Sequence, residues 1–398
     1  MEPALVRKAK RRRELHAPLP LAGTNDGLLP TDILHEVLLR LPANVLCRLR
    51  LVCRQWRSLT SDPIFARAHL LRHPVIVGCR NFGANVDRDA RRGVQFVDLS
   101  GNVVKRIRMR RYEWDYGHNL SVKPSLQSAL TTKSGCLLNP STGAFIVLPG
   151  YTAEGQPIMS LSLLGRISST GEYKVLRIHR FHRYIMGSEP GQTCEVMTVG
   201  DSGDDGRWMA RASPPVNVAV TSLHGVVVNG VAYFLLDVCD PTNIKWGDIA
   251  SFDLDTEEWR SDTLQGPPKC LLPIADEETR ICLHLAKLNG CLVTICRYNS
   301  RGLHYKDYDS MDLWFLVGMD KGLWTKMYSL QCTPELEHGL CSPLEVLNDG
   351  RILLWGSSIQ CLGVYDKKTN ILTDLMTLRN FSGVCLYEGS LLCPNLQD

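Results

Sequence analysis

The sequence lacks the patterns that mark a metal site or a membrane span. Although the chain has 15 cysteines, none forms a C-x-x-C pair, and Cys291 and Cys296 have no second pair that would complete a zinc site. The most apolar window, residues 225–238, is interrupted by Asn229-Gly230 and is too short to cross a bilayer. We therefore expect no metal, no cofactor and no membrane partner.

Catalytic signatures are also missing. The chain has no G-x-S-x-G elbow, no H-E-x-x-H helix, no phosphate-binding loop and no dinucleotide fingerprint. His179 and His182 lie close together, but the neighbouring arginines Arg177, Arg180 and Arg183 carry positive charge that opposes metal binding. We expect no catalytic residues, and an enzyme whose site is assembled from distant segments stays open as an alternative.

Positive charge is concentrated at the N-terminus. The net charge is +4, and residues 1–14 contain six basic and two acidic residues, so the remainder of the chain is neutral. A neutral body argues against a nucleic-acid partner, which would require a basic surface. Residues 1–27 have the composition of a disordered basic tail. Its run RKAKRRR is typical of a nuclear import signal and equally of a solvated tail, and no secretory signal is visible, so we expect the nucleus, the cytoplasm or both.

Helical periodicity is strongest between residues 29 and 65. Apolar residues repeat every three or four positions in a first pattern that starts at Pro30 and ends at Pro42, and in a second pattern from Leu49 to Leu59. Two short helices cannot bury all of this apolar surface on each other, so we expect a partner to cover part of it. A small helical hairpin packed on its own domain is the alternative.

The order of residues in this stretch resembles the F-box motif. It is carried by Leu29-Pro30-x-Asp32, Leu41-Pro42, Arg50-x-Val52-Cys53-x-x-Trp56-x-x-Leu59 and Asp62-Pro63-x-Phe65. The resemblance implies an F-box domain over residues 28–72 that docks the Skp-family adaptor of a cullin–RING ubiquitin ligase. The residues expected to bind the adaptor are Leu29, Pro30, Ile33, Leu34, Val37, Leu38, Leu41, Pro42, Leu46, Val52, Cys53, Trp56 and Leu59.

The sequence does not sort these apolar residues, because some must face the other helix and not the adaptor. Adaptors of that family are acidic, so we expect exposed arginines to assist association from the rim of the interface. The candidates are Arg40, Arg48, Arg50, Arg54 and Arg57.

From residue 73 onward, short β-type runs alternate with turn residues. Six segments consist of an apolar run, a polar turn and a second run: 94–107, 136–149, 193–210, 249–262, 312–330 and 361–376. Asn229-Gly230, Asn289-Gly290 and Asp349-Gly350 predict further tight hairpins at spacings of sixty residues. The final run, 381–393, has no outer hairpin after it and is expected to complete the first blade of a ring.

These features predict an α+β multidomain fold, in which a small all-α helical unit precedes an all-β propeller of six blades. A pair of irregular β-sandwiches is the alternative. Short motifs in residues 73–398 resemble the F-box-associated domain of plant F-box proteins, a kelch-like propeller: NPSTG (139–143), GEYKVLRI (171–178) and CEV (194–196). Together the two resemblances imply a non-catalytic substrate-recognition subunit of a Skp–cullin–F-box ubiquitin ligase. A scaffold that acts through the propeller alone, or a propeller enzyme, stays open.

Four long segments of the β part are expected to form one face that binds an unknown target protein: 108–119, 179–192, 240–248 and 297–310. They are rich in arginine and aromatic residues, the types enriched at anchor positions of protein interfaces. The predicted target-binding residues are Trp114, Tyr116, Arg180, Tyr184, Trp246, Tyr298 and Tyr305. The alternative is that these segments are simply long, mobile loops.

Overall fold

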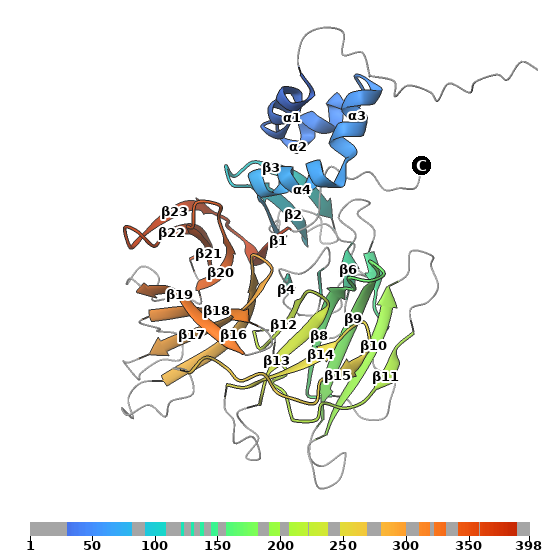
Figure 1. The fold of residues 1–398 in the computed structure, drawn as a ribbon, viewed down its shortest axis with the longest axis vertical. Coiled ribbons are helices and arrows are strands. Elements are labelled where there is room, and N and C mark those ends of the chain that lie inside the picture. The colour runs from blue at the N-terminus through green and yellow to red at the C-terminus, as the bar shows by residue number, and fades with distance from the viewer. Residues whose placement is uncertain are drawn as a thin grey trace, which may run out of the picture.

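A computed structural model shows a small helical unit joined to a larger β body (Figure 1). It describes residues 30–81, 92–108, 121–122, 129–130, 136–138, 145–149, 157–181, 191–199, 207–221, 223–237, 247–268, 280–299, 310–318, 322–331, 341–357 and 359–387. All helices and strands named below lie in these ranges. Helices followed by strands agree with the fold class predicted from the sequence.

The helical unit contains four helices, α1 (Thr31–Leu39), α2 (Ala43–Leu49), α3 (Arg54–Ser61) and α4 (Pro63–Arg72). The second predicted helix pattern is divided, because Cys53 has extended backbone and its Sγ accepts a hydrogen bond from the Trp56 amide at 3.4 Å. Cys53 therefore caps a new helix. Asp62 caps α4 in the same way, since its Oδ1 accepts from the Ile64 amide at 2.7 Å and Pro63 occupies the first helical position.

The β body is built from four-stranded antiparallel sheets. The first has the order β24 (Phe381–Leu386), β1 (Val75–Asn81), β2 (Arg92–Asp98), β3 (Val103–Arg108). The second is β8 (Met159–Arg166), β9 (Tyr173–Arg180), β10 (Gln192–Val199), β11 (Met209–Arg211). The third is β12 (Gly225–Val228), β13 (Val231–Leu235), β14 (Ile249–Asp253), β15 (Glu258–Trp259). The fourth is β16 (Arg280–Leu288), β17 (Cys291–Asn299), β18 (Ser310–Gly318), β19 (Leu323–Gln331). The fifth is β20 (Cys341–Val346), β21 (Ile352–Gly356), β22 (Cys361–Asp366), β23 (Ile371–Thr377).

These sheets are the five blades of a β-propeller, and the expectation of six is wrong. All six predicted outer hairpins exist, but the one within residues 136–149 pairs only β6 (Cys136–Leu138) with β7 (Phe145–Val147). The preceding strands, β4 (Ser121–Val122) and β5 (Ala129–Leu130), form a separate two-stranded sheet. Strands of two or three residues provide few ladder hydrogen bonds and little apolar surface, so no four-stranded blade forms in the described part of this region.

The last strand closes the ring, as the sequence predicts. β24 pairs with β1, so that Val77 lies opposite Cys385, and the Tyr387 amide donates to the carbonyl oxygen of Val75 at 2.8 Å. The first blade therefore combines both ends of the β part. Closure in this manner ties the two ends of the β part together, and each blade of a propeller keeps only short, protected edges.

Two of the three predicted hairpin turns have the backbone that their sequence favours. Asn229 and Gly230 have φ of 49° and 80°, and Asn289 and Gly290 have φ of 50° and 75°. Positive φ at both central residues is the signature of a type I′ turn. At Asp349-Gly350 only the glycine has positive φ, 83°, and the Asp349 carboxylate accepts from the Arg351 amide. The third hairpin therefore has a different turn.

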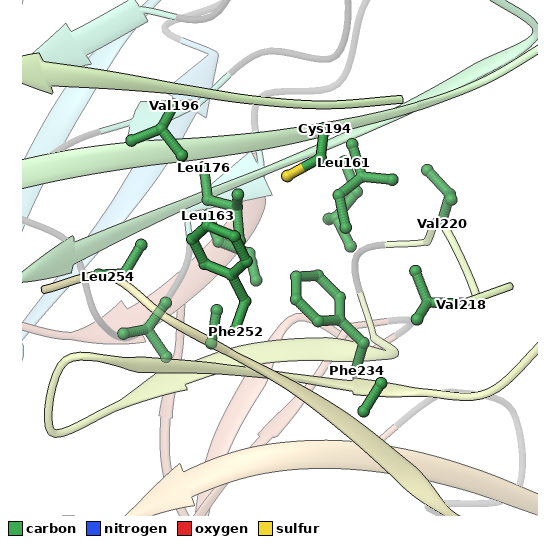
Figure 2. Packing of buried hydrophobic residues seen from close by; sticks show 14 of the residues in the cluster. Leu161, Leu163, Leu176, Cys194, Val196, Val218, Val220, Phe234, Phe252 and Leu254 are labelled. Atoms are coloured by element: carbon green, nitrogen blue, oxygen red, sulfur yellow. The ribbon is translucent and has the colours of Figure 1, made fainter. Parts of the chain in front are cut away.

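Apolar side chains fill the space between neighbouring blades. Figure 2 shows Leu161, Leu163 and Leu176 of the second blade facing Phe234 and Phe252 of the third. All five side chains are buried. Complete burial of such a side chain contributes roughly 1.5–3 kcal/mol, so these inter-blade layers are a main source of the stability of the propeller.

Candidate functional site

The helical unit divides its apolar residues into two groups. Leu34, Leu38 and Leu46 are buried and pack with Phe65 of α4 in the core of the unit. These side chains contact the core of their own unit, and their contact with an adaptor stays a prediction. Leu41, Trp56 and Leu59 are half-buried and pack against the same core.

The second group is exposed. Ile33 and Val37 are 49% and 45% exposed and lie one turn apart on α1, while Val52, in the link between α2 and α3, is 63% exposed. Pro30, Pro42 and Cys53 are exposed as well, and Leu29 lies outside the described residues. Leu51 is 87% exposed, although the sequence analysis did not include it. Its neighbours in the F-box resemblance, Arg50 and Val52, are the signal that would have identified it.

Arginines lie close to these exposed apolar residues in the sequence. Arg40, Arg48, Arg54 and Arg57 are exposed. Arg50 differs from the expectation, because its Nε donates to Thr60 Oγ1 at 3.1 Å and its Nη2 donates to the Thr60 carbonyl oxygen at 2.6 Å. It therefore ties the start of the α2–α3 link to the end of α3. Only exposed arginines are suited to steer a partner, so Arg50 serves the fold of the unit.

Two histidines attach α4 to the end of α1. His69 Nε2 donates to the carbonyl oxygen of Leu41 at 2.8 Å, and His73 Nε2 donates to that of Leu39 at 2.9 Å. Their rings stack with centroids 4.5 Å apart. Burial lowers the pKa of His69, and the nearby His73 lowers it further, whereas the bond to Leu41 raises it. Both bonds satisfy carbonyl groups that a helix end would otherwise leave unpaired.

The helical unit meets the propeller at one defined end. Only His73 and Pro74 separate α4 from β1, the second strand of the first blade. In an antiparallel blade the second strand starts at the end that carries the tight turns, such as 229–230 and 289–290. We call this the turn end of the propeller. Figure 1 shows the helices beside β1–β3, in agreement with this connection.

The four predicted recognition segments leave the propeller from the opposite end, which we call the link end. Three of them join second strands to third strands, and segment 108–119 follows the outer strand β3. Most of their residues lie outside the described part of the chain, including Trp114, Tyr116, Tyr184, Trp246 and Tyr305. Their role in target binding stays a prediction.

Arg180 and Tyr298 are the predicted target-binding residues that the structure describes. Arg180 Nη1 lies 2.6 Å from Asp237 Oδ2, so the ion pair joins the second blade to the third. The Tyr298 hydroxyl donates to Asp312 Oδ2 at 3.3 Å, and burial together with this carboxylate raises the pKa of Tyr298 to about 12. Both side chains thus have partners within the propeller, and contact with a target stays a prediction for them too.

Sequence reasoning missed one polar network in the second blade. Ser160 Oγ lies 2.7 Å from His179 Nδ1, and His179 Nε2 lies 2.9 Å from Glu195 Oε1. Arg177 Nη1 lies 3.4 Å from the same Glu195 oxygen, and its guanidinium lies 3.8 Å from the centroid of the Trp208 ring. Burial lowers the pKa of Arg177, and Glu195 partly offsets this.

The serine–histidine–carboxylate order resembles that of a nucleophile with its base. However, the same Glu195 oxygen also pairs with the buried Arg177 guanidinium, so this carboxylate joins two side chains of β9 to β10. We therefore assign the network a packing role between strands. In the described ranges, no group of three or more His, Cys, Asp or Glu side chains is arranged to hold a metal ion. Within the same ranges, no helix is both long enough and apolar enough to cross a membrane.

Comparison with known proteins agrees with this two-part architecture. Residues 27–72 match the F-box-like family, and residues 105–375 match the family described as the F-box associated beta propeller domain. An F-box protein of Arabidopsis thaliana is 25% identical over 96% of this chain and 97% of its own length. An F-box/LRR-repeat protein of the same plant is 27% identical over 79% of this chain and 69% of its own length.

Solved structures are more distant. An oligogalacturonate lyase from Vibrio parahaemolyticus aligns with a TM-score of 0.39 at 10% identity, covering 72% of this chain and 71% of its own. That level of similarity carries no functional argument. The family matches extend over more than half of the chain and agree with the helical unit and the propeller described above. The chain therefore belongs to the plant-type F-box proteins that carry an F-box associated beta propeller domain.

Proposed function

We propose that this F-box protein is the substrate-recognition subunit of a Skp–cullin–F-box ubiquitin ligase. The single observation that carries the proposal is the exposure of Ile33, Val37, Leu51 and Val52 on a helical unit whose core is already filled. A buried aliphatic side chain contributes about 1.5–3 kcal/mol. A partner that covers these side chains would gain roughly half of that from Ile33 and Val37, and more from Val52 and Leu51, which are more exposed.

The docking surface in this proposal consists of Pro30, Ile33, Val37, Pro42, Leu51, Val52 and Cys53, all of which are exposed. Leu34, Leu38 and Leu46 support it from the core, and the half-buried Leu41, Trp56 and Leu59 contact the partner at most with their edges. Arg40, Arg48, Arg54 and Arg57 attract the acidic adaptor, which accelerates association more than it strengthens the complex.

In this mechanism the chain performs no covalent step. The F-box domain holds the Skp-family adaptor and, through it, the cullin–RING ligase, while the propeller holds the target protein at its link end. Because the helical unit is attached at the turn end, the target occupies the opposite side of the propeller. Tethering raises the local concentration of target lysines near the ubiquitin carrier. We place the protein in the nucleus, the cytoplasm or both.

Co-purification with the adaptor tests this proposal. Full-length chain and an Ile33→Asp variant would be expressed in plant cells, and the bound adaptor and cullin would be quantified. We expect the variant to lose both, because the carboxylate would enter an apolar interface without a partner. Val317→Asp is the matched control, since Val317 is 51% exposed on β18, far along the chain from the helical unit.

Equal recovery of adaptor with Ile33→Asp and wild type would refute the proposal. It would favour a scaffold that acts through the propeller alone. The third alternative, a propeller enzyme, would be supported by a catalysed reaction that the Ile33→Asp variant still performs after it has lost the adaptor.

A further inference from the structure

A cavity of about 640 Å³ lies where the helical unit meets the first blade. Its walls come from the start of α2, from α4, from the first residue of β1 and from the turn between β2 and β3. It is thus shared by two parts of the chain. Pro42 is the one lining residue that it has in common with the docking surface, and the cavity lies away from the link end of the propeller. Ligand cavities in proteins typically measure about 300–1,000 Å³ and often lie between domains.

The walls are held in place before any ligand arrives. His69 of α4 and His73, the residue that follows α4, donate hydrogen bonds to the carbonyl groups of Leu41 and Leu39 at the end of α1, and Pro74 alone separates His73 from β1. On the opposite wall, Asp98 Oδ1 accepts from the amides of Ser100 and Asn102 at 2.9 and 2.8 Å, which fixes the β2–β3 turn. Preformed walls reduce the ordering cost of binding.

The lining specifies the chemistry of an occupant. Val45, Leu70 and Val103 give it an apolar character, and the lining residues that the structure describes include neither lysine nor arginine. Asp98 is the acidic residue among these lining residues, and its Oδ2 already accepts a hydrogen bond from Asn102 Nδ2 at 3.0 Å. An anion would therefore meet no cationic partner, and a cation would compete with a carboxylate that the turn already uses.

Hydrogen-bond acceptors remain at the histidines. Each ring donates its Nε2–H to a backbone carbonyl, which leaves Nδ1 of a neutral imidazole as an acceptor. Burial lowers the pKa of His69, so this ring is neutral near pH 7. A ligand with an N–H or O–H group would satisfy such an acceptor, which an unsubstituted hydrocarbon would not.

We propose that this cavity binds a small neutral molecule with an apolar body and one hydrogen-bond donor, and that the molecule bridges the F-box domain and the propeller. The inference rests on the junction and does not depend on adaptor docking. Since the ligand contacts both parts, it stabilises their relative orientation. The consequence for the position of a target relative to the ligase rests on the proposed function.

Three naphthalene probes test the proposal on the full-length chain. 2-Naphthol is neutral at pH 7 and carries one donor, naphthalene lacks the donor, and 2-naphthalenesulfonate is an anion. We expect saturable binding of 2-naphthol with a sub-millimolar Kd by fluorescence titration. Naphthalene should bind about three- to tenfold more weakly, the range that one hydrogen bond provides, and the sulfonate should bind more weakly still.

Substitutions that fill the cavity locate the site. Val103→Trp and Ser100→Trp place an indole at the rim, and both positions are exposed enough to accept it without a buried clash. We expect each to weaken 2-naphthol binding at least about tenfold, whereas Val317→Trp on β18 leaves it unchanged. Unchanged circular dichroism would show that the variants remain folded.

Equal binding to wild type and to a folded Ser100→Trp variant would overturn the proposal. So would the absence of saturable binding. Binding that appears only after residues 388–398 are deleted would also overturn it, because the cavity would then be filled by the end of the chain that follows Tyr387.

Discussion

Truncation of two neighbouring residues on α1 should change stability by very different amounts, because Val37 is 45% exposed and Leu38 only 1%. Leu38→Ala removes three carbons from the core that Leu34, Leu46 and Phe65 complete. Buried leucine-to-alanine changes cost about 2–5 kcal/mol, and the packing around Leu38 leaves little room for collapse. Val37→Ala removes side-chain atoms that already contact water, and should change stability by no more than about 0.5 kcal/mol.

Native-state hydrogen exchange on the full-length chain measures both effects within the helical unit alone. Leu38→Ala should accelerate exchange of the α1 and α4 amides by roughly 30-fold or more, the factor that corresponds to about 2 kcal/mol. Propeller amides should not change, and they serve as an internal control. Similar acceleration by both variants, or none by Leu38→Ala, would refute the division into core and docking residues.

Three further predictions concern the propeller. Phe234→Ala should lower the free energy of unfolding by about 3–5 kcal/mol in urea titrations, because this fully buried ring packs between the second and third blades, and a loss below 1 kcal/mol would contradict that packing. Burial raises the pKa of Glu257, but Lys174 and Arg211 more than offset this, so the pKa in the folded protein lies below 4.5. The ionised Glu257 therefore stabilises the fold above pH 4.5, and this stabilisation is lost as the pH falls through the folded pKa. Glu257→Gln should therefore be less stable than wild type at pH 7 by roughly 1.5–3 kcal/mol, with a difference that shrinks on acidification in thermal melts, and a pH-independent difference would count against the ion cluster. Gly230→Ala should lower the free energy of unfolding by about 1 kcal/mol in the same urea titrations, because the φ of 80° at this position strains any residue with a Cβ. An unchanged free energy of unfolding would contradict the left-handed backbone at this turn.

Local patterns identified most of the β part. The outer hairpins and the type I′ turns at Asn229-Gly230 and Asn289-Gly290 depend on residues adjacent in sequence, so alternation and turn composition were sufficient. The number of blades could not be predicted from such local patterns. Whether β4–β7 join into one sheet depends on a ladder between strands that the hairpin pattern does not specify.

Burial within the helical unit shows the same limit. Ile33 and Leu34 are consecutive apolar residues that fit overlapping helical repeats, and the sequence gives no reason to bury one and expose the other. Leu34 is buried because it packs in one core with Phe65 on α4, a residue from a distant part of the motif. The Ser160–His179–Glu195 network was not predicted for a related reason. The register between neighbouring strands brings these residues together, and their spacing in the sequence does not indicate it.

The most direct test of the account is the affinity of the purified full-length chain for a Skp-family adaptor, measured by calorimetry for wild type, Val37→Asp and Val317→Asp. Both valines are about half exposed, at 45% and 51%, so the two substitutions are matched in chemistry and in their effect on the core. The account predicts a loss of at least about a hundredfold in affinity for Val37→Asp and no change for Val317→Asp. Equal affinity of all three proteins, or no binding by wild type, would contradict it.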